Sequence, residues 1–91
     1  MADQLETQRR KLLFRSVRRG TKESDMVIGG FAEAHIGDLD GGQLDRFEAL
    51  LDENDQDVLA WVIGMKPAPA AFDSDVLDMI RNFKKSLQSF D

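Results

Sequence analysis

The fold of this chain is organised around residues 9–23, which read RRKLLFRSVRRGTKE. The apolar face of this stretch and the turn before it consists of Leu5, Leu12, Leu13 and Val17. That spacing is typical of a helix, and arginines fill much of the remaining surface. Gly20 interrupts the pattern, and glycine readily adopts the left-handed conformation that ends many helices. We therefore predict a basic helix over residues 4–19, followed at once by a helix over residues 22–35.

The charges along the chain are strongly segregated. Residues 1–22 contain seven Lys or Arg and two acids, whereas residues 23–57 contain one Arg and eleven acids. Residues 58–91 contain four of each sign, and the whole chain has a net charge of −5. A basic N-terminal helix in front of an acidic body therefore says more about partners than the overall charge does.

Three further helices are predicted downstream, over residues 41–53, 55–63 and 74–87. Asp40 and Gln43 have the spacing of a capping box, in which each side chain bonds the other's backbone N–H. The third of the five predicted helices therefore has the clearest start. No alternating strand pattern occurs anywhere in the chain, and we expect an all-α fold, a compact bundle of five short helices.

Two of these helices carry additional expectations. The helix over residues 55–63 is apolar nearly all round, so we expect it to be the most buried. Gly29 and Gly30 weaken the helix over residues 22–35 by about 1 kcal/mol each relative to alanine. A kink, or the close approach of a neighbouring helix, would explain them.

Length and composition limit the possible classes of protein. Ninety-one residues predict one domain, residues 1–91, and an apolar fraction of 42% is sufficient for a modest core. The absence of cysteine excludes disulfides, thiolate metal sites and cysteine nucleophiles. No apolar run reaches membrane-spanning length, and the N-terminal helix leaves no removable leader. We therefore expect a bacterial cytoplasmic protein without membrane insertion, and a monomer.

Catalytic and metal-binding patterns are missing from the sequence. His35 is the only histidine, and its place at the end of a predicted helix indicates a C-terminal cap. The acidic residues 52–57 lack the glycine and glutamate of a calcium loop, and Gly41-Gly42 lacks the lysine of a phosphate loop. We predict that the protein is not an enzyme and binds no metal.

The basic helix raises the alternative of a nucleic-acid partner. The seven cations of residues 1–22 could follow a phosphate backbone. The acidic block that follows and the lack of aromatic residues placed for stacking argue against this, and we expect no nucleic-acid partner. Phe14 lies between basic residues and is expected to be partly exposed, which suits a contact anchor.

Arg19-Gly20-x-x-Glu23 has a simple structural interpretation. Gly20 would end one helix, and Glu23 would stabilise the N-terminus of the next through the helix dipole. On spacing alone this corner between two helices would be the preferred interpretation. The residues that surround this segment in the sequence favour a functional interpretation instead.

Five stretches of the chain together resemble the succinate dehydrogenase flavin-assembly factors, the SdhE-type family. These stretches are RKLLFRS at residues 10–16, RRGxxE at 18–23, Phe31-Ala32, LDxFExLL at 44–51 and DQDVLAW at 55–61. RGxxE alone is a weak signal, but the order and spacing of all five are specific. Thr21 and Gln56 depart from the family pattern, which commonly has an apolar residue and a proline there.

The resemblance implies a five-helix bundle that binds the flavoprotein subunit of succinate dehydrogenase and promotes covalent attachment of FAD to a histidine of that subunit. Fumarate reductase could be a second client in bacteria. The resemblance also implies that Arg19, Gly20 and Glu23 carry the partner-binding role. The secondary contacts would be Phe14, Arg15, Arg18, Thr21 and Lys22. We expect that the protein holds no cofactor tightly and acts on FAD bound to its partner.

These residues could act by positioning the partner. Arg19 and nearby bases would pair with partner carboxylates, Gly20 would permit close backbone approach, and Glu23 would accept hydrogen bonds near the flavin. Such docking could orient the acceptor histidine and the flavin methyl group. The alternative is a generic acidic helical adaptor without a flavin role.

Overall fold

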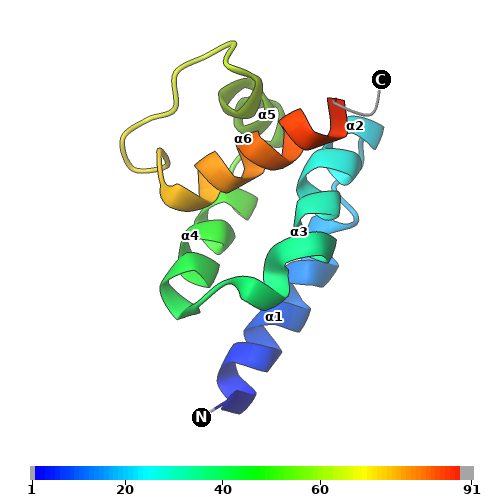
Figure 1. Ribbon diagram of the computed structural model, residues 1–91, viewed down its shortest axis with the longest axis vertical. Coiled ribbons are helices and arrows are strands. Elements are labelled where there is room, and N and C mark those ends of the chain that lie inside the picture. The colour runs from blue at the N-terminus through cyan, green and yellow to red at the C-terminus, as the bar shows by residue number, and fades with distance from the viewer. Residues whose placement is uncertain (1, 89–91) are drawn as a thin grey trace.

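All regular structure in the part of the chain that the structure describes is helical (Figure 1). The structure, a computed structural model, describes the backbone of residues 2–88 and the side chains of residues 4–87. The elements in order are α1 (Ala2–Ser16), α2 (Lys22–Ser24), the π-helix η1 (Asp25–Gly29), α3 (Gly30–His35), the 3₁₀-helix η2 (Ile36–Asp38), α4 (Gly41–Leu51), α5 (Asp55–Ile63) and α6 (Asp75–Gln88). Because α2, η1 and α3 follow one another without interruption, they form one helical segment. The predicted all-α bundle of five helices is thereby confirmed.

The bundle is built around α1 and α6, which each contact several other helices. α1 packs against α4 and against the segment formed by η1 and α3, and α6 crosses α4, α5 and η1 (Figure 1). Phe31 lies at the meeting point, fully buried, with its ring centroid 5.6 Å from that of Phe47 and 6.2 Å from that of Phe83. Both pairs meet edge to face, the arrangement that aromatic quadrupoles favour.

The N-terminus of α4 is joined to α6. Asp40 and Gln43 form the predicted capping box, with each side chain bonded to the other's backbone N–H. The Asp75 carboxylate at the start of α6 accepts hydrogen bonds from Arg46 Nε at 2.8 Å and Gln43 Nε2 at 3.1 Å. The Arg46 bond, and after it the Gln43 bond, lower the pKa of Asp75 below its ordinary value.

The first helix ends earlier than predicted, at Ser16 instead of Arg19. The Ser16 hydroxyl is buried and donates to the Leu12 carbonyl at 2.6 Å. The Arg19 backbone N–H donates to the Asp25 carboxylate at 2.8 Å, which an α-helical Arg19 would not do. Gly20 has φ +103°, as predicted for a glycine in the left-handed region, but it lies in the turn beyond the helix.

The helix over residues 55–63 has the predicted bounds but is not the most buried one. Val58, Trp61 and Val62 are buried, whereas Ile63 is 42% exposed. Trp61 stacks on Phe72 at 5.3 Å between ring centroids, so the loop after the helix covers one side. The main helix contact of α5 is with α6, and Ile63 on its outer side remains in solvent.

Both glycines of the second helix sit at close contacts. A Cβ atom on Gly29 would lie 3.0 Å from the Ser16 carbonyl oxygen, and one on Gly30 would lie 3.2 Å from the Phe83 ring. Close approach of neighbouring helices therefore explains the pair. Gly29 lies in the π-helical turn η1, in which Val27 and Ile28 are buried while Met26 is 54% exposed.

Gly29→Ala should destabilise the protein by about 1–3 kcal/mol, because the added methyl group meets backbone atoms of Ser16 and Val17 that cannot move independently. Gly37→Ala is the matched control, since nothing lies within 4 Å of its Cβ position. Urea denaturation followed by circular dichroism measures both. Equal stability of the two variants would contradict the close contact between α1 and η1.

Candidate functional site

The basic arm and the acidic block bind each other inside the molecule. Side chains of α1 and the turn after it contact side chains of α4 and the start of α5 in a row of polar pairs. The pairs are Gln8–Asp45 at 2.9 Å, Lys11–Glu48 at 3.4 Å, Arg15–Asp52 at 2.6 Å and Arg19–Asp55 at 2.9 Å. The residue numbers of both partners increase from pair to pair, so residues 8–19 and residues 45–55 run parallel and in register. Much of the charge segregation seen in the sequence therefore serves contacts within the molecule, between the basic residues of α1 and the acidic residues of α4 and α5.

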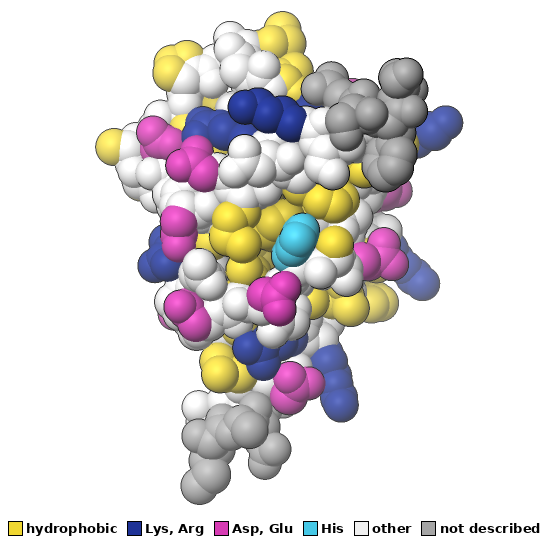
Figure 2. All heavy atoms as spheres, in the orientation of Figure 1, with side chains coloured by type: hydrophobic (Ala, Val, Ile, Leu, Met, Phe, Trp, Pro, Cys, Tyr) yellow, Lys and Arg dark blue, Asp and Glu magenta, His cyan; other side chains and the backbone are white. Residues whose placement is uncertain are grey.

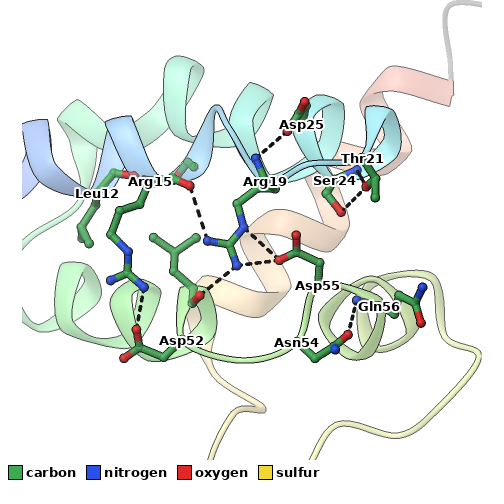
Figure 3. A network of polar contacts seen from close by, with 12 residues as sticks. Leu12, Arg15, Arg19, Thr21, Ser24, Asp25, Asp52, Asn54, Asp55 and Gln56 are labelled. Atoms are coloured by element: carbon green, nitrogen blue, oxygen red, sulfur yellow. Dashed lines mark hydrogen bonds and ion pairs between the residues drawn. The ribbon is translucent and has the colours of Figure 1, made fainter.

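Arg19 is the most enclosed cation of this row, and Figure 3 shows its polar contacts. Its side chain is 13% exposed, and that of Asp55 is 17% exposed. The guanidinium donates from Nε to Asp55 at 2.9 Å, from Nη2 to the Leu51 carbonyl at 2.8 Å and from Nη1 to the Arg15 carbonyl at 3.4 Å. One side chain thus joins the ends of α1 and α4 to the first turn of α5.

The backbone around Arg19 fixes the start of α2. The Arg19 N–H is held by the Asp25 carboxylate, and Thr21 caps α2 by accepting from the Ser24 N–H at 3.2 Å. The Thr21 hydroxyl also donates to the buried Ser24 hydroxyl at 2.8 Å. Between them, Gly20 adopts a positive φ that other residues rarely adopt. The corner formed by residues 19–25 is therefore anchored on both sides of its glycine.

Glu23 is the exposed carboxylate of this corner. It lies in the first turn of α2 and forms no ion pair or hydrogen bond with any residue that the structure describes. Gly20, Thr21 and Lys22 are exposed beside it. The Glu23 carboxylate therefore has no partner among the described residues, whereas the backbone of the corner is hydrogen-bonded.

The predicted site residues separate into two groups. Arg15 and Arg19 are engaged by the acidic residues of α4 and α5. Phe14 is 63% exposed, as expected, and the Arg18 guanidinium carbon lies 5.3 Å above its ring centroid. This cation–π contact leaves both side chains at the surface.

Sequence reasoning missed the residues that support the corner. Neither Asp55 nor Asp25 was assigned a role at the corner, yet both carboxylates hold Arg19. Only the spacing of Thr21 and Ser24, which suits an N-cap, was visible in the sequence. The pairing of Arg19 with a residue 36 positions away depends on how the helices pack.

His35 lies in an aromatic setting away from the corner. Its ring centroid is 5.4 Å from that of Phe31 and 5.9 Å from that of Phe83, and Figure 2 shows it within a patch of apolar side chains. Among the described residues, no group of three or more His, Asp or Glu side chains is placed to hold a metal ion. Within residues 2–88, no helix combines the length and hydrophobicity needed to cross a bilayer.

Comparison with known proteins gives a consistent family. Residues 10–84 match the model of a family described as the flavinator of succinate dehydrogenase. The chain is 32% identical over 83 residues to succinate dehydrogenase assembly factor 2, mitochondrial, of Dictyostelium discoideum, which covers 91% of this chain and 59% of that protein. It is 29% identical over 86 residues to assembly factor 2-A, mitochondrial, of Drosophila mojavensis, covering 92% of this chain and 55% of that protein. The chain spans about half the length of the curated relatives it matches.

The relatives correct one prediction. They are eukaryotic proteins whose names place them in mitochondria, so the prediction of a bacterial cytoplasmic protein is wrong. That prediction depended on the lack of a targeting segment. Such a lack says nothing about compartment for a chain that spans about half the length of its relatives.

Arg19→Ala should destabilise the protein by about 2–4 kcal/mol, because it leaves the enclosed Asp55 carboxylate and the Leu51 carbonyl without their donor. Lys11→Ala is the control from the same row. Its side chain is 62% exposed, and exposed ion pairs contribute only about 0–1 kcal/mol. Chemical denaturation of both variants measures the difference, and a similar small loss in each would show that Arg19 is not a structural anchor.

Proposed function

This chain belongs to the succinate dehydrogenase flavinator family, and from that premise we propose that it binds the flavoprotein subunit of succinate dehydrogenase and promotes covalent attachment of FAD to it. The names of the relatives, succinate dehydrogenase assembly factors, support this assignment. In this proposal the protein works in the mitochondrion, as the names of those relatives state of them.

The observation that carries the proposal is the anchored backbone from which Glu23 projects. The carboxylate is exposed and unpaired among the described residues, while Arg19, Asp25 and Thr21 hold the backbone on either side of Gly20. A backbone that is already ordered loses less conformational freedom on binding. Glu23 can therefore accept hydrogen bonds from donors of the flavoprotein from a fixed backbone position.

Arg19 acts in this proposal through the corner and not through the partner. Its guanidinium donates to Asp55, Leu51 and Arg15, so few of its donors remain for an incoming carboxylate. Its role is to position Gly20 and Glu23. Phe14, Arg18 and Lys22 are the exposed residues of the proposed surface that can make additional contacts.

The protein contributes positioning, and the bond-forming chemistry belongs to the flavoprotein and its flavin. Docking on an immature flavoprotein would restrain a mobile part of it and hold the acceptor histidine near the flavin. Orientation of this kind lowers a barrier by up to about 7–11 kcal/mol in well-aligned systems. On this proposal the chain is not itself an enzyme and holds no FAD tightly.

The internal charge pairing bears on the nucleic-acid alternative. Lys11, Arg15 and Arg19 face acidic residues of α4 and α5, so phosphates would have to compete with these contacts. This supports a protein partner over a nucleic acid.

Glu23→Ala should greatly reduce covalent flavin on the succinate dehydrogenase flavoprotein, because it removes the acceptor without altering an internal contact. The measurement is flavin fluorescence of the denatured flavoprotein on a gel, from cells lacking this protein and supplied with each variant. Glu33→Ala, which changes another exposed acid, is the control and should restore the signal fully. A full signal with Glu23→Ala would contradict the assigned role.

Alanine variants of two glycines distinguish an effect on folding from an effect on function in the same assay. Gly20 and Gly64 both have positive φ and no atom within 4 Å of a Cβ position, so alanine at either should cost about 1–2 kcal/mol. Gly20→Ala alone should lower covalent flavin, since Gly64 lies after α5. Equal flavin loss in both variants would indicate that reduced stability, not the corner, limits the activity.

A further inference from the structure

Glu23 borders a groove that the sequence did not suggest. The groove has a volume of about 380 Å³ and lies between α2, the end of α5 and α6. Its lining consists of Glu23, Val62, Ile63, Arg81, Lys84 and Lys85. The exposed acceptor of the corner and the cations of the last helix therefore share one depression.

The charges in this groove are not neutralised by one another. Glu23, Lys84 and Lys85 form no ion pair with any residue in the described part of the chain. Arg81 differs, because its guanidinium bonds Asp73, Asp78 and the Trp61 carbonyl. Among the described residues, the groove thus has an anion on α2 and two cations on α6 that form no ion pair.

The floor between these charges is apolar. Val62 is buried, and Ile63 is 42% exposed, one of the few large apolar side chains in the described chain with that much surface in solvent. An inorganic anion would gain nothing from this floor. A peptide segment with an apolar side chain would bury it and reach both charged ends.

We infer that this groove is a second part of the docking surface and takes a flavoprotein segment in which an apolar side chain is followed by a carboxylate. The apolar side chain would cover Ile63, and the carboxylate would pair with Lys84 and Lys85. Charge complementarity supports this occupant, since Lys84 and Lys85 pair with no carboxylate among the described residues and therefore favour an acidic group at this position. The inference rests on the proposed function and specifies which chemistry of the partner the site recognises.

The test uses the whole chain and the purified, FAD-loaded flavoprotein subunit of succinate dehydrogenase as the probe. Lys84→Glu/Lys85→Glu should weaken binding by about tenfold or more, and the loss should shrink as salt is raised. Lys66→Glu is the matched control, because Lys66 is exposed and does not line the groove. It should change the dissociation constant by less than about twofold. Circular dichroism confirms that each variant remains helical.

Four outcomes decide the matter. Weakening confined to the groove variant supports the inference. Wild-type affinity of the groove variant, with binding lost in Glu23→Ala, overturns the inference and leaves the proposed function intact. Failure of the unaltered chain to bind the flavoprotein at all overturns both. Self-association of the unaltered chain in sedimentation, abolished by Lys84→Glu/Lys85→Glu, would assign the groove to a second copy and also overturn the inference.

Discussion

The contact between Arg19 and Asp55 is the interaction on which the rest of the structure depends. It closes the row of polar pairs between α1 and α4 at the point where α1, α4 and α5 come together. Most pairs in that row are exposed and contribute little individually. The Arg19 pair is the enclosed one, and the same residue's backbone holds Asp25. The position of Gly20 and Glu23 follows from these bonds.

This arrangement changes the meaning of the charge distribution. A basic arm in front of an acidic body suggests two surfaces for two partners, but here α1 lies along α4 with the charges matched. What remains for a partner is the charges that have no ion pair among the described residues. Of these, Glu23, Lys84 and Lys85 line one groove, although they are far apart in the sequence.

Local signals in the sequence predicted the elements well. The capping box of Asp40 and Gln43, the extent of helix 55–63 and the exposure of Phe14 all depend on neighbouring residues, and all agree with the structure. The end of α1 was wrong because its cause is tertiary. Arg19 leaves the helical hydrogen-bond pattern for Asp25, Asp55 and the Leu51 carbonyl, which the sequence alone does not bring together.

The sequence grouped the candidate site residues but did not show the contacts that hold them. Resemblance of motifs placed Arg19, Gly20 and Glu23 together, and spacing could explain the glycine. It could not distinguish an arginine that meets a partner from one that supports the corner, because burial decides between them. Sequence reasoning also could not place Lys84 and Lys85 beside Glu23, since a groove between helices leaves no recognisable pattern in the sequence.

The most direct measurement is an experimental structure of this chain bound to the succinate dehydrogenase flavoprotein. We predict that Glu23 lies in the interface with a flavoprotein donor in hydrogen-bond contact, while Arg19 still bonds Asp55 and the Leu51 carbonyl. A complex in which Arg19 has left Asp55 to pair with a flavoprotein carboxylate, or in which Glu23 faces solvent, would contradict the central claim that an internally anchored corner presents Glu23.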